Sequence, residues 1–121
     1  LATSDLVSVN SRLDPSTHHL LDAAALARMK PGAYLVNTSR GGVVDQAALV
    51  EALRSGHLGG AALDVLEREP IAPDDPLLSL ANVVLTPHAA FYSRESLAEM
   101  KRRAAEAITA ALADHGPVGQ G

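Results

Sequence analysis

The sequence of 121 residues contains no cysteine, which excludes a disulfide framework and a thiolate metal site. It has no excess of basic residues, since 10 lysines and arginines stand against 14 aspartates and glutamates. The resulting net charge of −4 argues against a nucleic-acid-binding surface. No apolar run approaches the roughly 18 residues that a membrane-spanning helix requires, and no signal peptide is visible. Together these absences predict a cytoplasmic protein that binds neither nucleic acid nor a membrane.

Hydrophobic residues make up 47% of the chain, enough for a packed core, and they recur in short runs that alternate with helical patterns. The predicted strands are residues 6–9, 34–38, 60–65 and 82–86, and the predicted helices are residues 22–29, 45–56 and 93–113. Asp22 and Asp45 are predicted to cap the first two helices. We expect residues 1–113 to be the C-terminal portion of one domain and residues 114–121 to be a flexible tail.

Strands that are apolar on both faces and are separated by helices are typical of a parallel sheet covered on both sides, the doubly wound α/β class. All strands of such a sheet point the same way, so their C-terminal ends share one edge, where ligands bind. Arg40 follows the second predicted strand, Glu69 the third and His88 the fourth. The sequence therefore predicts that a guanidinium, a carboxylate and an imidazole gather at one edge of the sheet.

These three side chains suit the chemistry of 2-oxo acids. Arg40 offers a fixed fork of donors for a carboxylate or a polarised carbonyl. His88 can exchange a proton near neutral pH, and the carboxylate of Glu69 beside it would orient the ring and favour its protonated form. Together they could bind a 2-oxo acid, polarise its ketone and protonate the new alkoxide. The hydride must come from a cofactor.

Three stretches carry a resemblance to a known family: "LVNTSRGGVVD" (35–45), "GAALDVLEREP" (60–70) and "LTPHAAFYS" (85–93). In their order and spacing the chain resembles the C-terminal part of the NAD-binding, Rossmann-like domain of the D-isomer-specific 2-hydroxyacid dehydrogenases, over nearly its whole length. Within that family, "HHLL", "LVNTSRGG" and "TPHAAFYS" are most similar to the C-terminal binding protein branch. Members of that branch double as NAD-linked transcriptional corepressors in animals.

The resemblance implies a role for each matching residue. Arg40 would bind the substrate carboxylate and carbonyl, Glu69 would pair with the histidine, and His88 would be the acid and base. The cofactor would be NAD, and Asp64 would accept a hydrogen bond from its nicotinamide carboxamide. The other residues implied to contact the cofactor are Ser11, Arg12, Leu13, Asp14 and Thr17 in one loop, Thr38, Ser39 and Arg40 at the second corner, and His88, Ala89, Ala90 and Phe91 at the nicotinamide end.

Two departures from the family pattern affect the cofactor site. Many members have histidine at the position of Asn10 and proline at that of Arg12, so loop contacts to the cofactor would differ here. The chain also lacks a G-x-G-x-x-G turn and the acidic residue that follows the next strand. The resemblance implies that both precede Leu1, so that the pyrophosphate and ribose sites and most of the substrate domain lie outside this chain.

Each functional interpretation competes with a plainer one. Arg40 could form a surface ion pair, Glu69 could be a solvated loop charge, and Asp64 could cap the turn that follows it. The adjacent His18 and His19 are not expected to bind a metal, because neighbouring helical residues point apart and no further ligands are spaced for zinc. We expect no metal site.

The sequence thus predicts a fragment of an NAD(H)-dependent D-2-hydroxyacid dehydrogenase, homodimeric at full length, that interconverts a small 2-hydroxy acid and a 2-oxo acid. One alternative is an NAD-sensing, corepressor-like interaction protein with little or no turnover. Another is a pseudoenzyme impaired at the "NSRL" loop. The three predicted catalytic residues do not separate the first two, because corepressors of this family retain them.

Overall fold

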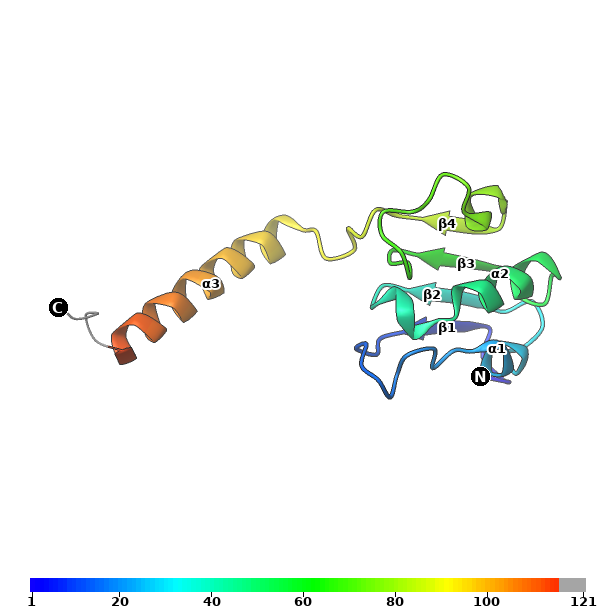
Figure 1. Ribbon diagram of the computed structural model, residues 1–121, viewed down its shortest axis with the longest axis horizontal. Helices are drawn as coiled ribbons and strands as arrows, with labels where there is room; N and C mark the ends of the chain where they lie inside the picture. Colours follow the sequence, from blue (N-terminus) through cyan, green and yellow to red (C-terminus); the bar gives the residue numbers. More distant parts are fainter. Residues whose placement is uncertain (116–121) are drawn as a thin grey trace. The chain divides into compact units, whose positions relative to one another are not determined.

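The computed structural model describes residues 1–115, in two compact units that divide after Ala90. The first unit contains β1 (Leu6–Val9), α1 (Ala23–Ala27), β2 (Tyr34–Asn37), the 3-10 turn η1 (Gly41–Val43), α2 (Gln46–Arg54), β3 (Gly60–Leu63), the 3-10 turn η2 (Pro76–Ser79) and β4 (Val83–Leu85) (Figure 1). The second unit contains one helix, α3 (Arg94–His115).

The four strands form a single parallel sheet in the order β1-β2-β3-β4, which confirms the predicted α/β class. Their C-terminal ends lie at one edge, where Arg40, Glu69 and His88 follow them in the chain. The last three strands end one or two residues earlier than predicted. Beyond the strand ends, the Asn37 side chain bonds to the backbone of the corner after β2, and the Asp64 side chain bonds to the backbone of the segment after β4.

Helices α1 and α2 begin where the sequence indicates. The Asp22 carboxylate accepts a hydrogen bond from the Ala25 N–H at 2.8 Å, and the Asp45 carboxylate accepts one from the Ala48 N–H at 3.0 Å. Each bond satisfies a backbone donor that the first turn of a helix leaves without an intrahelical partner. At the end of α2, Gly56 adopts a φ of +73°, a conformation that glycine reaches without steric cost. Both predicted caps are confirmed.

The core of the first unit lies between one face of the sheet and the helices α1 and α2, which pack against each other (Figure 1). Alternate strand residues such as Leu35 and Leu63 point into this core, as the period of a strand requires. On the opposite face Leu6, Tyr34 and Val84 are 57%, 54% and 61% exposed. The sheet was predicted to be covered on both sides, but within residues 1–90 the helices cover only one face.

The second unit begins with Phe91 and consists mainly of α3. Ser93 and Ser96 cap the helix reciprocally, since each backbone N–H donates to the other's hydroxyl at 2.9 Å. The helix continues to His115, two residues beyond the predicted end at 113. The predicted flexible tail therefore begins with helical residues, and its remainder, residues 116–121, lies outside the described residues. No helix within residues 1–115 is both long enough and apolar enough to cross a membrane.

Candidate active site

The corner that carries Arg40 is built around the side chain of Asn37, which is 1% exposed. Its Oδ1 accepts hydrogen bonds from the N–H and the hydroxyl of Ser39 at 3.0 and 2.9 Å, and its Nδ2 donates to the Arg40 carbonyl at 3.0 Å. A buried amide with all these partners fixes the local backbone. Sequence reasoning missed Asn37 as a functional residue. The available signal was a polar residue at the end of an otherwise apolar strand.

The next residue, Gly41, brings this corner against the loop that follows β3. A Cβ at position 41 would lie 1.9 Å from the carbonyl carbon of Leu66 and 2.4 Å from the backbone nitrogen of Glu67. Since these are backbone atoms, no larger side chain fits without moving the loop. The guanidinium of Arg40 is itself exposed and donates from Nη1 to the Ser39 carbonyl at 2.7 Å.

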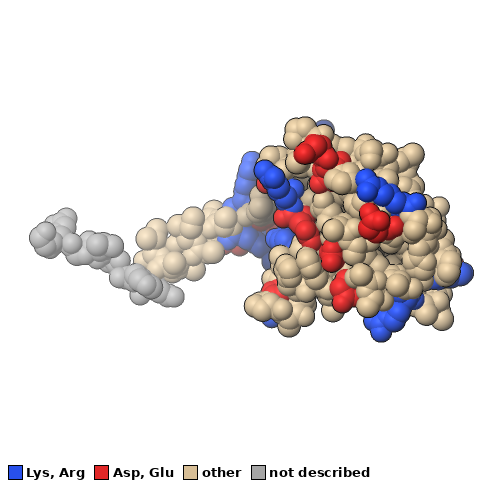
Figure 2. All heavy atoms as spheres, turned by 45° about the vertical axis from the view of Figure 1, so that its right-hand side comes forward, with Lys and Arg blue, Asp and Glu red and all other residues tan. Residues whose placement is uncertain are grey.

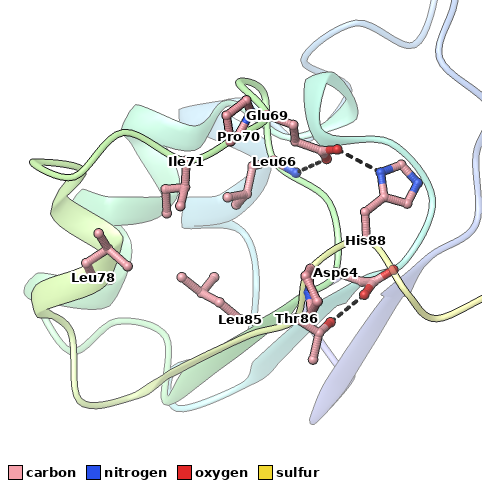
Figure 3. A pocket seen from close by; sticks show the side chains of 10 residues that line it. Asp64, Leu66, Glu69, Pro70, Ile71, Leu78, Leu85, Thr86 and His88 are labelled. Carbon is pink, nitrogen blue, oxygen red and sulfur yellow. Dashed lines mark hydrogen bonds and ion pairs between the residues drawn. The ribbon is translucent and has the colours of Figure 1, made fainter.

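Glu69 and His88 form the predicted pair. His88 Nδ1 lies 2.7 Å from Glu69 Oε2, and the Leu66 N–H donates to Glu69 Oε1 at 2.9 Å (Figure 3). The hydrogen bond from His88, followed by the one from Leu66, lowers the pKa of Glu69 below its usual value of 4.5. The carboxylate therefore stays ionised at neutral pH and can orient the imidazole.

Asp64 anchors the segment that carries His88. One carboxylate oxygen accepts from the Thr86 hydroxyl and from the Ala89 N–H, the latter at 2.9 Å, and the other oxygen accepts from the Ala90 N–H at 2.9 Å. Burial of Asp64 acts to raise its pKa, but the hydrogen bonds from Thr86, Ala90 and Ala89 outweigh burial and bring the pKa below 3.8. These bonds hold His88 at a φ of +53°, an uncommon conformation for a residue other than glycine.

This network leads to a prediction for Asp64→Asn in the full-length protein. An asparagine presents an NH₂ group where an oxygen now accepts a backbone or hydroxyl donor, so at least one donor loses its acceptor. We expect a loss of about 1–3 kcal/mol in the free energy of unfolding at neutral pH, measured by denaturant titration. The ionised carboxylate's contribution is complete above pH 3.8, so the loss should shrink as the pH falls through the lower pKa of folded Asp64. Asp74→Asn, in an exposed loop, is the matched control, and equal stability of both variants would contradict the expectation.

The structure brings the three predicted catalytic residues to one cavity of about 550 Å³, lined by Leu13, His18, His19, Arg40, Gly41, Gly42, Leu66, Glu67, Glu69 and His88. A neighbouring, largely apolar cavity of about 410 Å³ shares Leu66, Glu69 and His88 with it and extends past Asp64 to Ile71, Leu78 and Leu85 (Figure 3). The Glu69–His88 pair thus stands between a polar cavity that contains Arg40 and an apolar one.

Six of the residues predicted to contact the cofactor line a third hollow of about 460 Å³, together with Asn10: Ser11, Arg12, Leu13, Thr38, Ser39 and Arg40. Asp14 and Thr17 instead bond within their own loop. The Asp14 N–H donates to the Thr17 hydroxyl at 2.9 Å, and that hydroxyl lies 2.7 Å from the Arg12 carbonyl. Ala89 and Ala90 are held by Asp64, and Phe91 belongs to the second unit. The contacts of all these residues with a cofactor stay predictions.

The prediction that the His18 and His19 side chains point apart is wrong. Their rings do not point apart but stack, with centroids 4.0 Å apart, because the segment is a turn and not a helix. His19 has a φ of +52°. Its Nε2 lies 2.6 Å from the carboxylate of Glu67, a contact that no local pattern in the sequence indicates.

Comparison with known proteins identifies the family. Residues 1–90 match the sequence model described as the NAD-binding domain of D-isomer specific 2-hydroxyacid dehydrogenases. The chain belongs to this family. It is 54% identical over 110 residues to a glyoxylate reductase of Korarchaeum cryptofilum, a match that covers 91% of this chain and 33% of that protein. It is 49% identical over 96 residues to an (S)-sulfolactate dehydrogenase of Chromohalobacter salexigens, covering 79% and 31% of the two chains.

The fold also matches solved structures of the family. The crystal structure of D-lactate dehydrogenase from Aquifex aeolicus, complexed with NAD and lactic acid, aligns with a TM-score of 0.83 at 35% identity and covers 91% of this chain and 38% of that one. The chain spans about a third of the length of the curated relatives that it matches. These matches confirm the predicted family and its NAD-binding domain. They give no support to the narrower placement in the C-terminal binding protein branch or to the corepressor alternative.

Proposed function

We propose that the full-length protein containing this chain is an NAD(H)-dependent D-2-hydroxyacid dehydrogenase that reduces a small 2-oxo acid and oxidises the corresponding 2-hydroxy acid. The observation that carries the proposal is the convergence of Arg40 with the hydrogen-bonded Glu69–His88 pair on one cavity. Arg40 supplies a fork of donors for the substrate carboxylate. His88 supplies a proton that the reduction consumes and the oxidation returns.

The residues of this chain account for binding and proton transfer. Because Nδ1 of His88 is bound to Glu69, Nε2 is the ring atom that exchanges a proton with the substrate oxygen. In reduction His88 would give this proton to the carbonyl oxygen, and the ionised Glu69 would compensate the charge on the ring beforehand. Bound NADH supplies the hydride. Ser11 and Thr38 would hold it along the hollow beside β2, where their hydroxyls suit the oxygen-rich groups of a dinucleotide.

The proposal is tested by turnover of the purified full-length protein. Glyoxylate, pyruvate and 3-sulfopyruvate are each mixed with NADH or NADPH, and cofactor oxidation is followed by absorbance. We expect steady turnover of at least one 2-oxo acid and the reverse reaction with the corresponding 2-hydroxy acid, in its D form where the product is chiral. Binding of NADH without turnover of any member of the panel would contradict the proposal.

We also propose that the full-length protein is a cytoplasmic homodimer that binds a small acid and neither nucleic acid nor a membrane. The net charge of −4 argues against nucleic-acid binding, as does the face of the first unit in Figure 2, where acidic and basic side chains are interspersed and form no basic surface. Residues 1–113 would then be the C-terminal portion of the NAD-binding domain. Light scattering of the full-length protein should give twice the mass of one chain.

A further inference from the structure

A polar cluster outside the predicted catalytic residues is centred on Glu67, two positions before Glu69. Oε1 of Glu67 lies 2.6 Å from His19 Nε2 and accepts the Gln46 N–H at 3.1 Å. In return, the Glu67 N–H donates to Oε1 of Gln46 at 3.3 Å. We call His19, Gln46 and Glu67 the Glu67 clamp.

The clamp joins three segments that are distant in the sequence. His19 belongs to the loop after β1, and its N–H donates to the Gly42 carbonyl at 2.8 Å. Gln46 is the first residue of α2, and its Nε2 donates to Asp75 Oδ2 at 2.9 Å, beside the turn η2. The loop after β1, the corner after β2 and the loop after β3 are therefore fixed to one another at this point.

The peptide that the clamp holds touches both halves of the candidate active site. On one side the Leu66–Glu67 peptide lies so close to Gly41 that a Cβ there would sit 1.9 Å from the Leu66 carbonyl carbon. On the other side the Leu66 N–H donates to Glu69 Oε1 at 2.9 Å. Movement of this peptide would displace Glu69 relative to both His88 and the corner of Arg40.

His19, Asp45 and Glu67 each offer a possible metal-ligand atom, and these atoms all lie within 4.8 Å of one another. Their geometry nevertheless favours hydrogen bonding over a metal site. His19 Nε2 meets Glu67, whereas Nδ1 faces Asp45 Oδ2 at 3.9 Å, and the two ring nitrogens diverge so that one ion can bind only one of them. Asp45 Oδ1 already caps α2, and Glu67 Oε1 already has two partners. Each of His19, Asp45 and Glu67 thus already has a hydrogen-bond partner within the protein.

We propose that Glu67, held by His19 and Gln46, is a positioning residue that keeps Glu69 within hydrogen-bond distance of His88. This inference rests on the proposed function. Removing the clamp should let the 66–69 segment move, lengthen the Glu69–His88 contact and so weaken the attraction between the Glu69 carboxylate and the ring. Misplacement of a catalytic pair by about 1 Å lowers turnover by on the order of a hundredfold. Binding of NADH, whose proposed hollow lies beside β2, should change little.

The test uses the full-length protein with ¹⁵N-labelled histidine. The titration of the His88 ring is followed by NMR. The kinetic constants kcat and KM are measured with whichever 2-oxo acid the parent turns over in the test of the proposed function. In Glu67→Ala the titration curve of His88 should move to lower pH, as in Glu69→Gln, and kcat should fall tenfold to a hundredfold. Glu67→Gln keeps an acceptor for Gln46 and His19, so its His88 titration curve and its kcat should both stay close to those of the parent. In a Glu69→Gln background, Glu67→Ala should move the curve no further.

Controls separate positioning from general destabilisation. Arg68→Ala changes the adjacent exposed residue, and His57→Gln removes a histidine that bonds to the Leu26 carbonyl at 3.2 Å, outside the clamp. Both should leave the His88 titration unchanged. If Glu67→Ala does not fold, Gln46→Ala removes one arm of the clamp and should move the curve in the same direction. A curve that overlays the parent's in the folded variant overturns the inference, and absence of turnover in the parent overturns only the proposed function.

Discussion

Replacement of His88 by alanine in the full-length protein is expected to lower kcat/KM by about 10²–10⁴-fold near neutral pH, in both the reduction and the oxidation direction. The substitution removes the group that gives a proton to the alkoxide and takes one from the hydroxy acid. It leaves Asp64 able to accept the Ala89 and Ala90 N–H groups, so the segment should keep its path. NADH affinity, measured by fluorescence titration, should therefore stay near that of the parent.

A matched histidine substitution makes this result specific. His57→Ala removes a half-buried imidazole from the other end of the sheet and should change kcat/KM by no more than a fewfold. If His88→Ala retained activity within a fewfold of the parent in both directions, His88 would not be the acid and base. A loss of NADH binding equal to the loss of turnover would instead assign His88 to the cofactor site.

Replacement of Arg40 by lysine is expected to raise KM for the 2-oxo acid by about ten- to a hundredfold, with a small change in NADH affinity. Lysine keeps the positive charge but lacks the planar fork that binds a carboxylate through two parallel hydrogen bonds. A hydrogen bond to a charged group contributes about 1.5–3 kcal/mol, which corresponds to this range of KM. The bond from Nη1 to the Ser39 carbonyl, which helps to orient the guanidinium, would be lost as well.

The control is Arg54→Lys at the end of α2, where the guanidinium lies 3.5 Å from Glu51 on the surface. This variant should have the kinetics of the parent, because exposed ion pairs of this kind contribute little. Unchanged KM in Arg40→Lys would remove Arg40 from the substrate site. It would favour the interpretation of Arg40 as a surface charge.

The convergence of Arg40, Glu69 and His88 could be predicted because it follows from topology alone. In a parallel sheet every strand ends at the same edge, so it was sufficient to locate the strands and read the residues after them. The helix caps could likewise be predicted, because Asp22 and Asp45 each bond to a backbone group three residues away. Local chemistry and strand direction are both visible in a sequence.

The supporting contacts could not be predicted, because they join segments that only the folded chain brings together. The need for glycine at position 41 arises from the Leu66–Glu67 peptide, which comes from the loop after β3 and packs against it. The partner of His19 is Glu67, from another loop, and nothing near either residue indicates the other. The apolar pattern of the strands predicted two covered faces. It did not show that α1 and α2 would lie on the same one.

The most direct test of the proposed mechanism is a pair of pH–rate profiles for the full-length parent and Glu69→Gln. Glutamine keeps the shape and a hydrogen bond to His88 but removes the negative charge that favours the protonated ring. Reduction requires that form and is lost as the pH rises, so in Glu69→Gln it should fade at lower pH than in the parent. Oxidation requires the neutral ring and should persist to lower pH. Profiles that overlay in both directions would contradict the assignment of Glu69 as the partner of His88.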